Sequence, residues 1–138
     1  GGWIGQTITA IAGSSKWYDR GFITYSNSSK QEMLGVDERS LQIFGAVSEQ
    51  IASEMAAGAI SSSHAQVSIA VTGIAGPGGA AEGKPVGMIC HSWVIKNGLA
   101  RTTVCFLEGN RESIRKRAVA IALQGAIDLL LDAPLATV

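Results

Sequence analysis

The sequence has few charged side chains and no excess charge of either sign, since eleven Lys and Arg balance eleven Asp and Glu in 138 residues. Domains that grip the nucleic-acid backbone carry a clustered basic excess, so this balance argues against nucleic acid as a partner. Apolar runs fall far short of the roughly 20 residues of a transmembrane helix, and no signal-peptide pattern opens the chain. We therefore expect a cytoplasmic protein with no membrane partner.

Cysteine and histidine are also scarce, with two of each, and their spacing does not suit a zinc site. Cys90 and His91 are adjacent in an expected strand and therefore point to opposite faces of the sheet. No CxxC or HxxxH spacing occurs. We expect no metal site, and His91 on a buried sheet face with Ile89 and Trp93. Two thiols in a reducing compartment fit the sequence at least as well as a single disulfide.

The chain is instead rich in apolar residues (46%) and in glycine (17 residues), as in one compact domain with many tight turns. Periodicity and capping residues predict helices over 3–12, 38–44 (capped by Asp37), 49–61 (capped by Ser48) and 111–131, and a short helix opened by Ser28. Strands are predicted over 21–26, 67–73, 86–95 and 100–107. Helices flank the strands, and Asn97-Gly98 predicts a hairpin. The fold class we expect is α/β, as a single three-layer α/β/α domain with a mixed sheet.

The glycine-rich stretch after the 67–73 strand allows several interpretations. Gly78-x-x-x-x-Gly83-Lys84 nearly matches a phosphate-binding loop, but Pro85 replaces the required Ser or Thr, and a strand follows where a helix should open. Ligands of α/β sheets bind beyond the carboxyl ends of strands, so backbone N–H groups near Gly73 are equally good candidates for an anion site. Turn chemistry alone explains the same glycines.

Arg111 and Arg115 lie one turn apart at the start of the last expected helix. Such a pair is able to meet a phosphate. A solvated face on which the arginines pair with Glu108 and Glu112 is the commoner explanation for this pattern.

Lys30 is the most informative single charge. Ser28 and Gln31 form a capping-box pattern that would place Lys30 in the first turn of a helix, where the helix dipole lowers the pKa of an ammonium group. Lysines with a lowered pKa serve as general bases, and Tyr25 is near enough in sequence to share a hydrogen-bond network. Spacing alone favours a surface lysine and a half-buried tyrosine.

Several segments, in this order, resemble the CinA carboxy-terminal domain family. They are IAGSSKWYDRGFITYSN (11–27), LGV (34–36), GAVSE (45–49), TGIAGPGG (72–79), KPVG (84–87) and GNRESIRKRAV (109–119). The resemblance implies an α/β/α domain and an amidase that converts nicotinamide mononucleotide to nicotinic acid mononucleotide and ammonia in pyridine-nucleotide recycling. It implies no metal and no organic cofactor.

The family uses a serine nucleophile, a lysine and a tyrosine. Its Tyr-Ser-Asn-x-x-Lys motif is complete here, which implies that Lys30 takes the serine proton and that Tyr25 relays or orients it. The family serine lies in a Glu-Ser-Cys-Thr stretch before a Gly-Gly pair that Gly1 and Gly2 match. We therefore expect residues 1–138 to lack the amino-terminal strand and nucleophile segment of the domain, and to be inactive as they stand.

The nucleotide substrate requires binding groups as well as a nucleophile. The candidates are Gly1, Gly2, Asn27, Ser48, Thr72 and Gly73. Backbone N–H groups at the start of the 3–12 helix would stabilise the tetrahedral oxyanion.

Two other classes of function remain open. One is a non-catalytic nucleotide-binding or regulatory relative of the same fold. The other is the carboxy-terminal domain of a two-domain competence/damage-inducible protein. A homo-oligomer is also left open, because Trp3, Trp17 and Tyr18 fit either the core, which is the more usual place, or a dimer contact.

Overall fold

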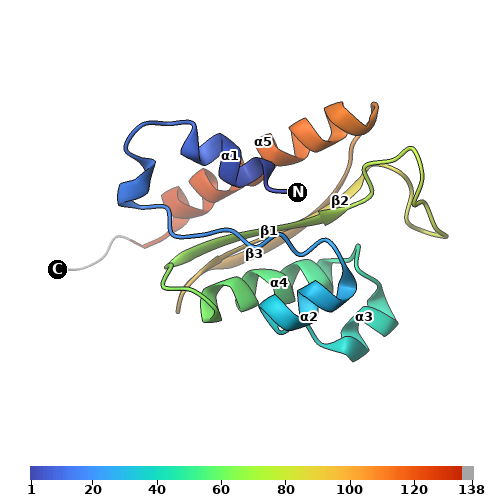
Figure 1. The fold of residues 1–138 in the computed structure, drawn as a ribbon, viewed down its shortest axis with the longest axis horizontal. Coiled ribbons are helices and arrows are strands. Elements are labelled where there is room, and N and C mark those ends of the chain that lie inside the picture. Colours follow the sequence, from blue (N-terminus) through green and yellow to red (C-terminus); the bar gives the residue numbers. More distant parts are fainter. Residues whose placement is uncertain (135–138) are drawn as a thin grey trace.

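The computed structural model of the protein describes residues 1–134, and Figure 1 shows the fold. The elements are α1 (Trp3–Thr9), the 3-10 helix η1 (Ser14–Lys16), α2 (Asn27–Leu34), α3 (Glu38–Phe44), α4 (Glu49–Ser61), β1 (Val67–Gly73), β2 (Met88–Ile95), β3 (Ala100–Phe106) and α5 (Arg111–Asp132). The strands form one sheet in the order β1-β2-β3. A hairpin joins β2 to β3 through Asn97 at φ 58°, as its Asn-Gly pair predicted.

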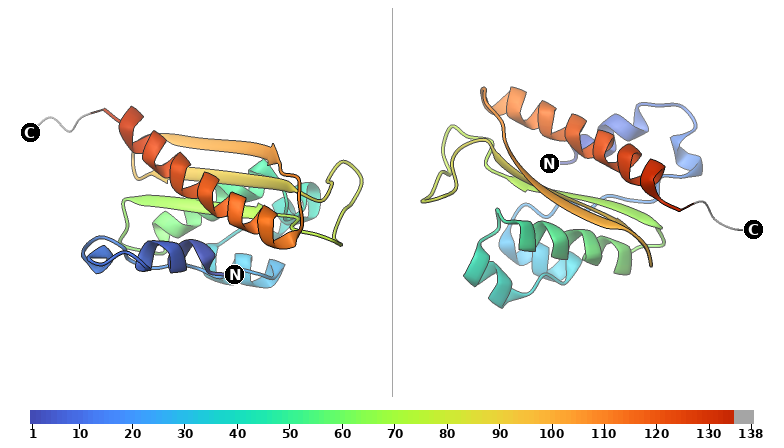
Figure 2. Two further views of the ribbon diagram at one scale, coloured as in Figure 1. Left: turned by 90° about the horizontal axis from the view of Figure 1, so that it is seen from above. Right: turned by 180° about the vertical axis from the view of Figure 1, so that it is seen from behind.

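Helices cover both faces of this sheet. Helix α4 packs on one face, with α2 and α3 outside it, and α5 packs on the other face with α1 beside it (Figures 1 and 2). The expected single α/β domain with three layers is thereby confirmed. The expected mixed pairing is not found among the described residues, because β2 pairs antiparallel with both β1 and β3.

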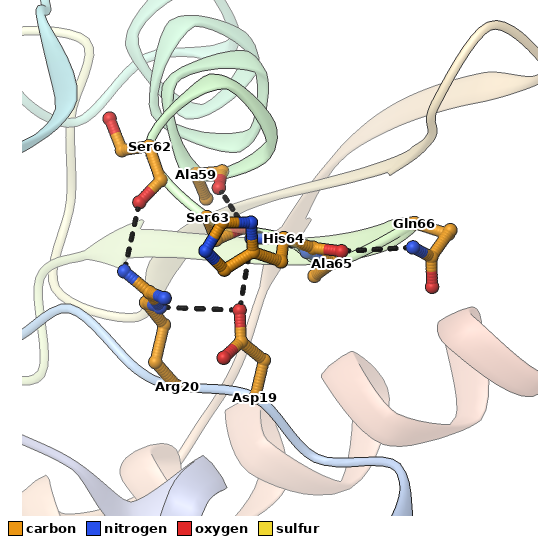
Figure 3. Close-up of polar contacts among 8 residues, drawn as sticks. All are labelled: Asp19, Arg20, Ala59, Ser62, Ser63, His64, Ala65 and Gln66. Atoms are coloured by element: carbon orange, nitrogen blue, oxygen red, sulfur yellow. Dashed lines mark hydrogen bonds and ion pairs between the residues drawn. The ribbon is translucent and has the colours of Figure 1, made fainter.

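The expected strand over 21–26 accounts for this difference. In the structure the segment is extended but belongs to no strand, and it runs on the β1 side of the sheet into α2 (Figure 1). Its start is fixed to the turn between α4 and β1: Asp19 Oδ2 accepts from the His64 backbone N–H at 3.1 Å, and Arg20 Nη1 donates to the Ser62 carbonyl at 3.2 Å (Figure 3). The β-forming side chains favour extension, but a strand also needs a paired neighbour.

The buried apolar residues form one cluster on each face of the sheet. The α4 face holds Leu34, Val36, Leu41, Ile51, Met55, Ala56 and Ala70, and the α5 face holds Ile89, Leu107, Ile114 and Ala118. Burial along α5 recurs at Ile114, Ala118, Ala122 and Leu129. Ile127 and Leu130 lie off this 3.6-residue stripe and are exposed.

Two aromatic side chains of β2 fasten the sheet to α5. His91 and Trp93 point to the same face and stack with ring centroids 5.4 Å apart. Trp93 Nε1 donates to the Ala122 carbonyl at 2.7 Å, and His91 Nε2 lies 2.9 Å from the Ala118 carbonyl. Because a carbonyl only accepts, Nε2 carries the imidazole proton, and the buried Nδ1 is left without a partner among the described residues.

This arrangement predicts a pH-dependent stability. Burial lowers the pKa of His91 from its ordinary value of 6.5. The unfolded chain therefore binds a proton at a pH where the folded chain does not, and the free energy of unfolding falls as the pH drops below about 6.5, by up to about 1.4 kcal/mol per pH unit. Urea titrations between pH 7 and pH 5.5 measure this slope.

The two histidines provide a matched control for that measurement. His91→Gln should flatten the slope, whereas the same change at the exposed His64 should leave it as in the unsubstituted protein. Equal slopes for the unsubstituted protein and His91→Gln would show that His91 does not link protonation to folding.

Candidate active site

The helix that carries Lys30 begins two residues earlier than the sequence suggested. Helix α2 is capped by Ser26, whose side chain accepts from the Ser29 N–H while the Ser29 hydroxyl accepts from the Ser26 N–H, each at 3.1 Å. The expected capping box from Ser28 to Gln31 is therefore wrong. Ser26 fits the preference for Ser or Thr at the cap, and the Ser29 hydroxyl takes the accepting role that Glu or Gln usually has three residues later.

The Lys30 side chain is buried, with 6% of its surface exposed. Its Nζ donates to the Thr24 carbonyl at 2.6 Å, in the extended segment that leads into α2. Burial lowers the pKa of the Lys30 ammonium from its ordinary value. The direction of this shift is the expected one, but its physical cause is desolvation, and the interpretation as a surface lysine is wrong.

Close packing of α2 on α4 fixes the helix that carries Lys30. A Cβ atom on Gly58 of α4 would lie 2.0 Å from the Leu34 carbonyl oxygen at the end of α2. Only glycine allows two helix backbones to approach this closely. The position of α2, and with it that of Lys30, depends on the absence of a side chain at Gly58.

Tyr25 lies next to the residue that binds Lys30 but is itself 80% exposed. Within the described residues, no hydrogen bond joins the Tyr25 hydroxyl to Lys30. Tyr25 and Lys30 therefore lie in the same 24–30 segment but are not hydrogen-bonded to each other. The alternative of a half-buried tyrosine is wrong, and the phenol is open to a substrate.

The first two residues lie against the same segment. Gly1 and Gly2 are exposed, and Gly2 caps α1 at φ 94°, a left-handed conformation that suits glycine. A Cβ on Gly2 would lie 3.3 Å from Ile23 Cδ1. The start of α1 therefore packs next to the stretch that ends in Tyr25. Helix α1 itself ends at Thr9, three residues earlier than expected.

Ser48 and Thr72 meet at the loop between α3 and α4. Ser48 caps α4, as predicted: its hydroxyl accepts from the Ile51 N–H at 3.2 Å and donates to the Gly45 carbonyl at 2.8 Å. The Thr72 hydroxyl donates to the Ala46 carbonyl at 2.8 Å. Both side chains are buried, and the proton of each hydroxyl is used within the protein. Their contribution to nucleotide binding stays a prediction.

Gly73 and Asn27 are exposed at separate places. Gly73 ends β1, where a Cβ would lie 2.3 Å from Ile89 Cδ1. Asn27 begins α2 and lines a hollow of about 280 Å³ between α2 and α3, together with Gln31 and Glu38. The residues that line this hollow come from α2 and α3, and none of them belongs to β1.

Two basic side chains anchor the glycine-rich loop after β1. Arg111 Nη1 donates to the Gly76 carbonyl at 2.9 Å, and Lys84 Nζ donates to the Phe44 carbonyl at the end of α3. Between the loop and the 43–47 segment lies a hollow of about 450 Å³. The sequence did not indicate either anchor, because both acceptors are backbone carbonyls far away along the chain.

The phosphate-binding-loop interpretation of this segment finds no support in the structure. Lys84 is occupied at the end of α3, and the segment leads into strand β2 and not into a helix. Lys84 therefore caps the carbonyl end of α3, where a cation is favourable.

The thiols and histidines do not assemble a metal centre within residues 1–134, where no three His, Cys, Asp or Glu side chains gather. Cys90 and Cys105 are free, and they lie on opposite faces of the sheet because Cys90 pairs with Val104 and Cys105 with Ile89. Burial raises the pKa of the Cys90 thiol to about 11, so it is not a thiolate nucleophile at neutral pH. In the same part of the chain, no helix has the length and apolar character needed to cross a membrane.

These features define an α/β/α domain with a buried lysine of lowered pKa, whose amine binds a carbonyl of the extended 21–26 segment. The model of the CinA C-terminal domain family matches residues 1–130. The chain belongs to this family, in agreement with the resemblance found in its motifs.

Named relatives and solved structures agree with this assignment. A nicotinamide-nucleotide amidohydrolase PncC of Enterobacter agglomerans is 47% identical over 127 residues, which are 92% of this chain and 77% of the relative. A crystal structure of the competence/damage inducible protein CihA from Agrobacterium tumefaciens superposes with a TM-score of 0.91 at 45% identity, covering 94% of this chain and 79% of that one. A CinA-like protein of Syntrophobacter fumaroxidans is 47% identical over 123 residues, 89% of this chain but 29% of the relative.

Proposed function

We propose that this domain is the catalytic part of an amidohydrolase that converts nicotinamide mononucleotide to nicotinic acid mononucleotide and ammonia. The observation that carries the proposal is the Lys30 amine, buried, hydrogen-bonded to the Thr24 carbonyl and lowered in pKa. Because its pKa is lowered, this amine loses its proton at a pH closer to neutral than an ordinary lysine does. The unprotonated amine has the free lone pair that a general base requires. The names of relatives that are 45% and 47% identical support the substrate.

The mechanism we propose is nucleophilic catalysis by a serine in the stretch that family members carry before the Gly-Gly pair. The serine oxygen attacks the carboxamide carbon while Lys30 accepts its proton, with Tyr25 relaying or orienting it. Lys30 then passes the proton to the departing nitrogen, ammonia leaves, and water hydrolyses the acyl-enzyme. N–H groups at the start of α1 would stabilise the oxyanion, and Gly1, Gly2, Thr72 and Gly73 would border the substrate.

This domain makes up most of some relatives and a small part of others. The second candidate is therefore that the domain belongs to a two-domain protein. Residues 1–138 cover only 29% of the CinA-like relative from Syntrophobacter fumaroxidans. In such an arrangement the domain is the carboxy-terminal part of a larger protein. The amidase chemistry proposed here is the same in either arrangement.

Ammonia release from nicotinamide mononucleotide tests the proposal, using protein that carries the Glu-Ser-Cys-Thr stretch before Gly1. We expect stoichiometric formation of ammonia and nicotinic acid mononucleotide without added metal, and no reaction when the serine of that stretch is replaced by alanine. Residues 1–138 alone should release no ammonia. Binding of the nucleotide without turnover by the longer protein would instead identify a non-catalytic relative.

A further inference from the structure

Strand β3 has a free edge in the sheet. In the order β1-β2-β3 it pairs with β2 alone. On the opposite border, the extended 21–26 segment runs on the β1 side of the sheet (Figure 1). In the left view of Figure 2, β3 forms the border of the sheet that is farthest from α1. Unpaired backbone N–H and C=O groups on such an edge are a template for another strand.

Two hydrogen bonds at the ends of β3 show which of its backbone groups are free. The Leu99 carbonyl accepts from the Ile95 N–H, and the Leu107 N–H donates to the Gly87 carbonyl, each at 2.8 Å. Both bonds run to the β2 side. Because backbone groups alternate in direction along an antiparallel strand, the odd-numbered residues of β3 bond to β2 and the even-numbered residues point away from it. The free N–H and C=O groups therefore belong to Ala100, Thr102, Val104 and Phe106.

The usual protections of a sheet edge are missing from β3. Natural proteins blunt their edges with lysine, proline or a bulge. The strand reads ARTTVCF, with neither lysine nor proline, and all seven residues stay in register with β2 without a bulge. Its one charge, on Arg101, is paired with Asp132 at 2.9 Å. No residue of β3 is fully buried, whereas five residues of β2 are.

We propose that β3 pairs antiparallel with β3 of a second copy of this chain, about a two-fold axis at Thr103. This register pairs all the free residues with one another: Thr102 lies opposite the partner's Val104, and Ala100 opposite the partner's Phe106. Each such pair exchanges two backbone hydrogen bonds. An axis one residue away would leave one end of each strand unpaired. Because a two-fold contact is self-complementary, the assembly closes at a dimer.

The side chains of β3 favour a second copy of this chain as the occupant. Phe106, which is 63% exposed, would cover the partner's small Ala100. Thr103 would face its own equivalent, and threonine pairs across strands are favourable. Arg101 would lie opposite the partner's Cys105 and not opposite another cation. The chain has no net charge, so two copies do not repel each other at long range.

Engineered cysteines test this register directly. At a non-hydrogen-bonded antiparallel pair the Cα atoms are about 4.5 Å apart, which is within the range of a disulfide. In protein that carries Cys105→Ser, the further change Thr103→Cys should give a covalent dimer on oxidation, as measured by non-reducing electrophoresis. Thr102→Cys is the matched control, because its two copies would be offset along the strands to more than about 7 Å and should crosslink at least tenfold more slowly. Equal crosslinking at the two positions, or none at Thr103→Cys, would overturn the proposed pairing.

Sedimentation equilibrium over a series of concentrations measures the association itself. We expect the unsubstituted chain to form a dimer that dissociates on dilution. Thr103→Glu places like charges face to face and should raise the dissociation constant at least tenfold, whereas Thr103→Gln, of the same size without the charge, should change it less than about threefold.

Folding and the proposed function are controlled separately. Circular dichroism establishes that each variant is folded, and the cysteine crosslinking decides the matter even if Thr103→Glu does not fold. A monomer at every concentration would overturn the inference and leave the β3 edge to an extended segment of another protein. None of these measurements uses ammonia release, so the dimer is tested independently of the proposed amidase function.

Discussion

Replacing Lys30 by methionine is expected to lower kcat/KM for nicotinamide mononucleotide between about a hundredfold and ten-thousandfold, the range that general acid–base groups contribute. Methionine fills most of the buried volume of the lysine stem but offers no lone pair of comparable basicity and no proton for the leaving nitrogen. The loss should fall mainly on kcat, because Lys30 acts on the serine and the leaving group. Steady-state ammonia release by protein with the complete family motif measures the effect.

Two controls separate the chemistry of Lys30 from its packing. Lys16→Met makes the same change at an exposed lysine of η1 and should leave both activity and stability unchanged. In the unsubstituted protein, kcat/KM should rise with pH through a pKa below the ordinary range of lysine, since burial lowers the pKa of Lys30. A folded Lys30→Met protein that retains full activity would remove Lys30 from the mechanism.

Gly58→Ala is expected to destabilise the domain by about 3 kcal/mol, at the upper end of the usual cost of overpacking. The added Cβ would lie 2.0 Å from the Leu34 carbonyl oxygen, and a backbone atom cannot turn away as a side chain can. Helices α2 and α4 would have to separate. For a domain of this size the midpoint of thermal unfolding should fall by roughly 10 °C, as measured by circular dichroism.

Gly78→Ala is the matched control for this substitution. A Cβ at Gly78 meets no atom within 4 Å, so the same chemical change should shift the free energy of unfolding by less than about 0.5 kcal/mol. A Gly58→Ala protein as stable as Gly78→Ala would show that α2 and α4 do not pack as closely as described. Any loss of activity in folded Gly58→Ala would then report on the position of Lys30, since α2 carries it.

Local signals predicted the helix starts apart from that of α2, and they failed where distant parts of the chain decide the structure. Asp37 and Ser48 cap α3 and α4 as expected, because a cap needs only a side chain and the N–H groups two or three residues later. The 21–26 segment has the β-forming residues of a strand, but pairing depends on a neighbour that its own sequence does not specify. Its extended course was predictable, and its lack of pairing was not.

In the candidate site too, local sequence predicted some features, and packing between distant parts of the chain decided the others. The Tyr-Ser-Asn-x-x-Lys motif led to Lys30, and the expected direction of its pKa shift was correct. The burial that causes the shift is a property of tertiary packing, and the Thr24 carbonyl that binds the amine is a backbone group with no signature in the sequence. The contact between Arg111 and the Gly76 carbonyl spans 35 residues and could not be inferred from spacing.

The three tryptophans occupy three different environments, which gives the protein a set of built-in optical probes. Trp17, for which a core position and a dimer contact were both left open, is 66% exposed, whereas Trp93 is 2% exposed and stacked on His91. Trp3 lies under the Arg115 guanidinium at the start of α1. Emission from Trp17 therefore reports on solvent, emission from Trp93 on the packing of α5 against the sheet, and emission from Trp3 on the start of α1 and the arginine beside it. With Trp17 replaced by phenylalanine, the remaining fluorescence separates unfolding of the core from events at the candidate site without any added label.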